Sequence, residues 1–279
     1  MAEFKRKFGI DISRWQGDYN FSQAIKEGVE FVIIKGGDNK TGLITDIKFE
    51  ENYKKAKAHG LDVGCYWYSK ALTETEAIKE AEYFYQHCLK GKQFELPVYI
   101  DVEHKEMLAL GKDKLTNIII AFCDYLESKG YFVGIYSSLS YFKTYMNDSR
   151  LQGYTHWVAC WADTCDYPYS KSFGMWQFGG ERNTQRSNMI AGKITDQDYM
   201  LVDFPEKIKR VGLNGYTKET IKEEPKEEIK EEADFIDRFT QKIEDAEKYK
   251  QIKELLDKIE KSMDDTNETI DELSKLLEE

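Results

Sequence analysis

The sequence predicts an α/β barrel followed by a smaller all-α module, and three observations carry that prediction. Up to about residue 147, short strand-like runs alternate with amphipathic runs, a pattern typical of parallel strands covered by helices. About eight strands fit within roughly 200 residues, and the later ones follow closely. We therefore expect an irregular (β/α) TIM-like barrel with eight strands and fewer than eight helices. After Pro205 only helix-like spacing remains.

The expected strands are short apolar or alternating runs. They are residues 8–13, 31–37, 63–69, 97–103, 132–137, 156–162, 174–178 and 194–202. The expected helices carry apolar residues three and four positions apart. They are residues 21–28, 49–60, 73–89, 112–129 and 141–146. Thr73 and Glu76 have capping-box spacing, and Gly28 and Gly60 are stop signals.

Two carboxylates stand at the end of the strand at 97–103. Successive strand residues point to opposite faces, so Asp101 and Glu103 share a face with Cα atoms roughly 6.5–7 Å apart. Burying a charge is costly unless it is paired or used. The two carboxyl groups can therefore stand on either side of one substrate bond, one as a catalytic acid and the other as the second carboxylate. The plainer interpretation is a strand that runs into an acidic loop. His104 follows on the opposite face and is expected to be a solvated or supporting residue.

Closure of a barrel would bring further polar and aromatic side chains to the same rim. Parallel barrels carry their chemistry at the C-terminal ends of the strands. The residues at or near such ends are Asp11, Lys35, Tyr68, Asp101, Glu103, Tyr136, Trp161, Trp176 and Asp198. No single strand could hold them together, so the prediction of a site depends on the prediction of the barrel.

Composition narrows the classes of partner. The net charge is −11 and no basic face is visible, which argues against nucleic acid. No run approaches about 18 apolar residues, so we expect no membrane insertion. The five cysteines lack metal-ligand spacing, so no metal or other cofactor is expected. The first residues lack an apolar signal-peptide core, which predicts a reduced protein made in the cytoplasm.

Three ordered motifs carry a family resemblance. They are GIDISRWQG at residues 9–17, PVYIDVE at 97–103, and MWQF at 175–178 followed by Gly192 and Asp198. In this order and at these separations the sequence resembles the glycoside hydrolase family 25 lysozymes, the Chalaropsis-type muramidases common among phage endolysins. The resemblance spans residues 8 to about 204. It implies an irregular eight-stranded barrel and cleavage of the β-1,4 bond between N-acetylmuramic acid and N-acetylglucosamine in peptidoglycan.

The resemblance also implies roles for the acids. Glu103 would be the general acid, Asp101 the second carboxylate, and Asp11 and Asp198 would complete the cluster. Asp196 competes for the last position, but counting six residues from Gly192 favours Asp198. A substrate-assisted, an inverting and a covalent route all remain open. The candidates for substrate contacts are Lys35, Tyr68, Tyr136, Trp161 and Trp176. As alternatives, Lys35 could pair with an acid and Trp176 could belong to the core.

We expect a catalytic barrel at residues 1–205, a charged linker at 206–228, and a helical module at 229–279. The last segment has apolar residues spaced three and four apart and no Gly or Pro. It could target the cell wall, drive self-association, or merely solubilise the chain.

The expected function is therefore that of a peptidoglycan hydrolase, a phage endolysin made in the host cytoplasm. It would reach the wall through a holin-type pore or after lysis. Two alternatives stay open. One is a non-catalytic glycan-binding barrel with a partner-binding tail, and the other is a related amino-sugar hydrolase such as a chitinase.

Overall fold

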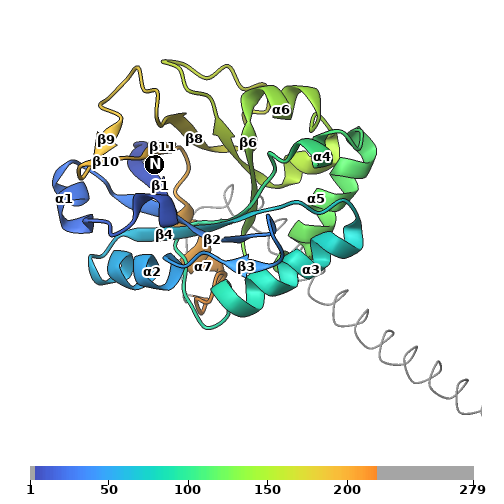
Figure 1. The fold of residues 1–279 in the computed structure, drawn as a ribbon, viewed down its shortest axis with the longest axis horizontal. Coiled ribbons are helices and arrows are strands. Elements are labelled where there is room, and N and C mark those ends of the chain that lie inside the picture. The colour runs from blue at the N-terminus through green and yellow to red at the C-terminus, as the bar shows by residue number, and fades with distance from the viewer. Residues whose placement is uncertain (1–3, 219–279) are drawn as a thin grey trace, which may run out of the picture. The chain divides into compact units, whose positions relative to one another are not determined.

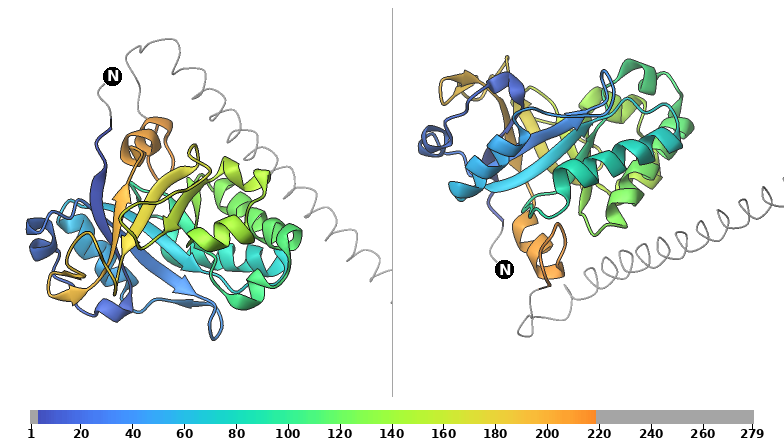
Figure 2. Two further views of the ribbon diagram at one scale, coloured as in Figure 1. Left: turned by 90° about the horizontal axis from the view of Figure 1, so that it is seen from above. Right: turned by 60° about the horizontal axis from the view of Figure 1, so that its bottom comes forward.

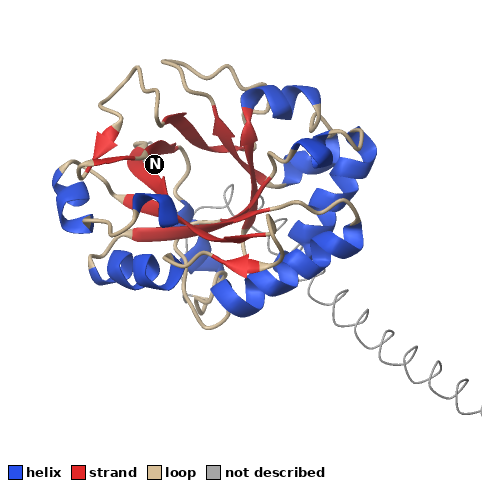
Figure 3. Cartoon of the chain, in the orientation of Figure 1, coloured by secondary structure: helices blue, strands red, loops and turns tan. Residues whose placement is uncertain are grey.

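A computed structural model describes residues 4–218 of the chain. The later part of the expected linker and the whole expected module at 229–279 lie outside the described residues. Figures 1 and 3 show the described part as a ring of strands with helices around its outside.

Eight strands close the barrel, because β1 pairs with both β11 and β2 at the two ends of the order β1-β11-β8-β7-β6-β5-β4-β2. These strands are β1 (Lys7–Ile12), β2 (Phe31–Asp38), β4 (Asp62–Tyr68), β5 (Val98–Asp101), β6 (Val133–Ser138), β7 (Thr155–Ala159), β8 (Phe173–Gly179) and β11 (Asp196–Met200). All neighbouring pairs are parallel except those that β11 makes with β1 and β8, which are antiparallel.

Within residues 4–218 the chain forms seven α-helices. They are α1 (Phe21–Lys26), α2 (Phe49–Ala58), α3 (Glu74–Phe84), α4 (Lys105–Leu108), α5 (Lys112–Glu127), α6 (Leu139–Thr144) and α7 (Phe204–Val211). No α-helix lies between β7 and β8 or between β8 and β11. The prediction of an irregular barrel with eight strands and fewer than eight helices is confirmed.

The sequence did not predict the smallest elements. These are β3 (Ile44–Thr45), which pairs with β2, the hairpin of β9 (Met189–Ile190) and β10 (Lys193–Ile194), and the helices α4 and α7. The strand expected at 97–103 ends at Asp101, although Val102 still donates its N–H to the carbonyl of Tyr136. Such short elements carry too few residues for a periodic signal.

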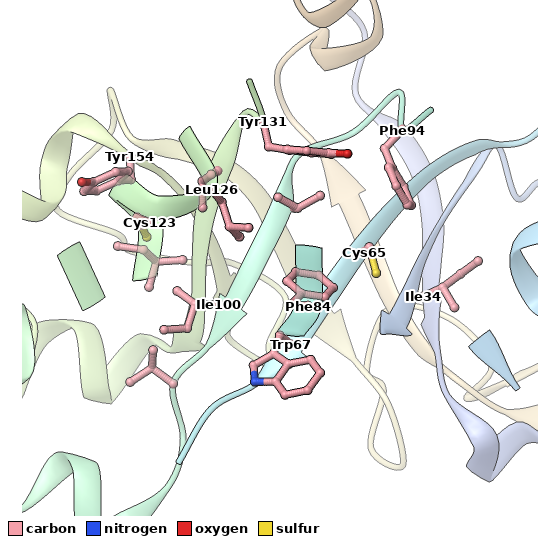
Figure 4. Packing of buried hydrophobic residues seen from close by; sticks show 14 of the residues in the cluster. Ile34, Cys65, Trp67, Phe84, Phe94, Ile100, Cys123, Leu126, Tyr131 and Tyr154 are labelled. Carbon is pink, nitrogen blue, oxygen red and sulfur yellow. The ribbon is translucent and has the colours of Figure 1, made fainter. Parts of the chain in front are cut away.

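The strands bury both faces, as parallel barrel strands do. Outward-facing residues pack against the helices, for example Cys65 and Trp67 of β4 against Phe84 of α3 (Figure 4). Inward-facing rings fill the barrel: the ring of Trp157 lies 5.2 Å from Tyr99 and 4.3 Å from Tyr136, between centroids. These aromatic rings form a floor beneath the rim that carries the acids.

The end of the barrel opposite the β9–β10 hairpin is covered by α7 and the residues that follow it (Figure 2). The sequence analysis places the start of a charged linker at residue 206, but α7 buries Ile208 there. Beyond it, the side chain of buried Asn214 accepts from the N–H of Phe132 at 2.7 Å and donates to the carbonyl of Leu96 at 2.8 Å. Packing on the barrel therefore extends past residue 205. None of the described helices has the length and apolarity needed to cross a membrane.

Candidate active site

Five carboxylates meet at one rim of the barrel. Because β11 runs antiparallel to its neighbours, its N-terminal end lies at the same rim as the C-terminal ends of the parallel strands. The five are Asp11 of β1, Asp101 at the end of β5, Glu103 two residues later, and Asp196 and Asp198 of β11. Asp11 stands opposite Asp196 in the β1–β11 register. The barrel thus brings together all four acids that the sequence analysis named, and adds Asp196.

Asp11 and Asp198 lie side by side below the rim. The charge of Asp198 adds to the rise in the pKa of Asp11, and Asp198 Oδ1 accepts the indole N–H of Trp157 at 2.7 Å. Asp198 is fully buried. Burial is the main cause that raises the pKa of each group. Two neighbouring buried carboxyl groups disfavour ionising together, so burial and like charge both favour protonation in this pair.

Gln177 of β8 holds this pair in place. The indole N–H of Trp161 donates to its Oε1 at 3.0 Å, and the hydroxyl of Tyr136 does the same at 3.0 Å. An indole can only donate, so the amide oxygen must face Trp161. The amide nitrogen therefore faces Asp11 and donates to Oδ2 at 2.8 Å. Three elements, β1, β6 and the segment after β7, are tied together through one side chain.

Of the other three acids, Asp101 is as buried as Asp11, whereas Glu103 and Asp196 are half-buried. Burial raises the pKa of Asp101 well above its usual range, and the charge of Glu103 adds to the effect. Burial also raises the pKa of Glu103. The pKa of Asp196 rises to about 6 through burial and then through the charges of Glu103 and Glu181. Like charges close together disfavour ionisation, so this rim can keep a carboxyl protonated near neutral pH.

One oxygen of Asp101 stands out. Its Oδ1 is buried and has no hydrogen-bond partner among the described residues. A buried acceptor without a partner is costly, by about 1–3 kcal/mol. The atom is therefore free to accept a hydrogen bond from a molecule bound at the rim.

Cationic and aromatic side chains line one side of the mouth. Lys35 is buried and forms an ion pair with Asp38 at 2.7 Å, and its Nζ lies 5.7 Å from the centroid of the Tyr68 ring. Burial raises the pKa of Tyr68 to about 12, so its phenol stays protonated. On the other side Trp161 is 43% exposed and presents a ring face to solvent. Exposed aromatic faces of this kind suit stacking on apolar faces of a ligand.

Trp176 is the one predicted residue that the barrel does not bring to the acids. Gln177 points inward, so its neighbour Trp176 points outward. There it packs against Phe178 and Tyr199, with ring centroids 6.1 and 5.9 Å away. His104 lies behind Tyr68, with Nδ1 3.5 Å from the tyrosine hydroxyl. It supports the rim rather than facing the acids.

Gln177 and Lys40 had no predicted role, and Asp196 was expected only as a competitor for the position of Asp198. Gln177 stood inside the MWQF motif, where the alternation of the strand could have marked it as inward-facing. Across residues 4–218, no group of three or more His, Cys, Asp or Glu side chains is arranged to hold a metal ion.

Comparison with known proteins gives the family context. The model of the glycosyl hydrolases family 25 matches residues 10–186. The autolytic lysozyme of Clostridium acetobutylicum is 33% identical over 153 residues, which is 54% of this chain and 44% of that protein. The chain therefore spans less than half the length of this curated relative.

Solved structures share the fold. The CTP1L endolysin superposes with a TM-score of 0.60 at 24% identity, and the match covers 73% of this chain and 69% of the endolysin chain. The bacterial lysozyme of Streptomyces coelicolor superposes with a TM-score of 0.59 at 23% identity, and the match covers 70% of this chain and 91% of the lysozyme chain. At these identities the likeness concerns the fold.

Proposed function

Since the chain belongs to the glycosyl hydrolases family 25, we propose that it is a muramidase. It hydrolyses the β-1,4 bond between N-acetylmuramic acid and N-acetylglucosamine in bacterial peptidoglycan. The observation that carries the proposal is the pair of Asp101, buried at the end of β5, and Glu103, half-buried two residues later, on the rim where barrel enzymes place their chemistry.

Glu103 acts as the general acid in this proposal. Departure of a sugar needs a proton on the leaving oxygen, and the donor must still hold that proton near the working pH. Burial raises the pKa of Glu103, which meets this requirement. Asp196 lies nearby, and the charge of Glu103 contributes to the raised pKa of Asp196. Asp11 and Asp198 hold the floor of the site in place, because Gln177 donates to Asp11 and Trp157 donates to Asp198.

Asp101 acts on the sugar itself. Its unpartnered Oδ1 can accept the N–H of a substrate acetamido group, which would orient that group for attack on the anomeric carbon. In a covalent route the same oxygen would attack that carbon directly. The anomeric form of the product, followed by NMR in the first minutes of reaction, separates retention from inversion. Trapping with a 2-deoxy-2-fluoro sugar separates the two retaining routes, since this sugar lacks the acetamido group.

The test is Glu103→Gln on purified peptidoglycan. The variant keeps the shape but cannot donate the proton, so we expect activity to fall by about 10²–10⁴-fold with folding intact. Glu106→Gln is the matched control, because Glu106 is exposed and lies only three residues after Glu103. Mass spectrometry of wild-type digests should find new reducing N-acetylmuramic acid ends. Retention of more than a few per cent of activity in Glu103→Gln, or reducing N-acetylglucosamine ends, would refute the proposal.

In its biological setting we assign the chain the role of an endolysin. Its relatives include an autolytic lysozyme, and a similar fold occurs in an endolysin. The enzyme would act on the wall once a holin-type pore or lysis releases it. Residues 229–279 would then either target the wall or join copies of the chain.

A shortened chain tests the role of the tail. Because Asn214 packs on the barrel, the cut belongs after residue 218 and not after 205. Light scattering of residues 1–218 and of the full chain reports self-association, and pelleting with cell walls reports targeting. Identical behaviour of the two chains in both assays would exclude both wall targeting and self-association as roles of the tail.

A further inference from the structure

The loop after β2 holds a lysine over the mouth of the barrel. Its backbone is anchored at successive residues: the N–H of Asn39 donates to the carbonyl of Tyr68 at 3.3 Å, and the N–H of Lys40 donates to Asp38 Oδ1 at 3.0 Å. The side chain of Asn39 donates to Glu80, a fully buried carboxylate, at 2.8 Å. Lys40 is exposed but rises from a fixed backbone.

The charge of Lys40 lowers the pKa of nearby Asp38 without forming an ion pair with it. Its Nζ lies 4.6 Å from the centroid of the Tyr68 ring, and it makes no ion pair with any residue in the part of the chain described. Lys35, by contrast, is paired with Asp38. Lys40 is nevertheless close enough to the acids to lower the pKa of both Asp101 and Glu103. The ammonium of Lys40 therefore lies beside the acids at the barrel mouth without an ion-pair partner.

Such a mouth repels anions unless a cation compensates. Muramic acid carries a carboxyl group on its lactyl ether, and the peptide stem attached there ends in further carboxylates. Chitin-type chains of N-acetylglucosamine are neutral. We infer that Lys40 binds a carboxylate of the peptide stem and so determines specificity for stem-bearing glycan over neutral glycan. This inference rests on the proposed muramidase function.

The position of the Lys40 side chain suits binding of the substrate and not a part in bond cleavage. An exposed ion pair is weak and is screened by salt, so its loss raises KM by about 3–10-fold and not by orders of magnitude. The Tyr68 ring beneath the ammonium keeps it above the mouth, where a stem peptide projecting from the glycan would pass. A long flexible side chain on a rigid backbone can follow stems of different length.

The experiment compares Lys40→Met, Lys40→Arg and a control, Lys105→Met, which removes another exposed lysine, on α4. The substrates are soluble peptidoglycan fragments with free stem carboxylates, and the same fragments after those carboxylates are converted to methylamides. On free carboxylates, Lys40→Met should raise KM by about 3–10-fold, and Lys40→Arg should restore most of the affinity. Because Lys40 lowers the pKa of Asp101 and Glu103, its removal can change kcat, but that change should be the same on both substrates. On methylamides, wild type and Lys40→Met should have the same KM.

Salt provides a second readout. Raising NaCl to about 0.5 M should raise the wild-type KM for free carboxylates toward that of Lys40→Met, and leave the KM of the variant almost unchanged. An equal loss on both substrates, or a loss confined to kcat, would overturn the inference. If wild type cleaves neither substrate, the muramidase proposal fails instead, so the two failures are distinct.

Discussion

Replacing Asp196 by Asn should make the barrel more stable at neutral pH. Asp196 is the first residue of β11 and lies opposite Asp11 in the sheet. No side-chain hydrogen bond of Asp196 is found within residues 4–218, so the amide removes a charge without breaking a bond. The carboxyl lies near Glu103 and Glu181, and burial is the main cause that raises its pKa from 3.8 to about 6.

The magnitude follows from linkage. A carboxyl whose pKa is higher in the folded state binds protons more tightly when folded, so its favourable contribution is present at low pH and is lost as pH rises through 6. A shift from 3.8 to about 6 corresponds to about 3 kcal/mol at 1.36 kcal/mol per pKa unit. Nearly all of it is lost by pH 7.5, whereas only about 0.5 kcal/mol is lost at pH 4. Asp196→Asn should therefore add about 2–3 kcal/mol at pH 7.5 and little at pH 4.

Urea unfolding at pH 4, 5, 6 and 7.5, followed by tryptophan fluorescence, measures this difference. With an m-value of about 2–3 kcal/mol/M, the midpoint at pH 7.5 should rise by roughly 1 M. Asp166→Asn is the control, because the side chain of Asp166 is fully exposed and its change should be near zero at every pH. A gain that is equal at pH 4 and pH 7.5, or a loss of stability at pH 7.5, would refute the reasoning.

Three further changes test the hydrogen bonds and packing of the barrel and its site. Gln177→Leu leaves the hydrogen-bonding groups of Asp11, Tyr136 and Trp161 that face it without this partner. Urea unfolding should find that the free energy of unfolding falls by about 3–5 kcal/mol, and a fall below about 1 kcal/mol would contradict the role of Gln177. Asn214→Ala removes two bonds to backbone, and should lower stability by about 2–4 kcal/mol while kcat at low temperature stays unchanged. Gly37→Ala would place a Cβ 2.2 Å from the carbonyl oxygen of Ile44, so we expect β3 to shift and the thermal midpoint to fall; an unchanged midpoint would show that β3 is readily displaced.

The sequence predicts the barrel well because its helices and strands carry strong periodic signals. Every strand of the barrel lies where an apolar or alternating run was expected, within a few residues. The helix α7 was missed because it is short and its charged residues resemble a linker. What identifies it is contact with the barrel, through buried Ile208 and the bonds of Asn214. Contacts between distant segments leave no local pattern.

The site was less predictable than the fold because it depends on strand direction. A repeating β/α pattern suggests parallel strands throughout, which places the chemistry at C-terminal ends, and only the spacing from Gly192 favours Asp198 over Asp196. In the structure β11 is antiparallel, so its first residue lies at the rim and Asp198 lies two residues deeper. The two aspartates therefore do not compete for one position. Asp196 lies near Glu103 at the mouth, and Asp198 accepts the indole N–H of Trp157 below.

The acid cluster works against the stability of the barrel that holds it. Its members come from β1, β5 and β11, so the carboxyls meet only when the first and last strands pair. Burial raises the pKa of each, which means that the folded state becomes less stable as they ionise. Neutralising a carboxyl should then stabilise the fold and, at Glu103, abolish the proton donor. If the cluster serves catalysis, variants that neutralise its carboxyls should gain stability while they lose activity.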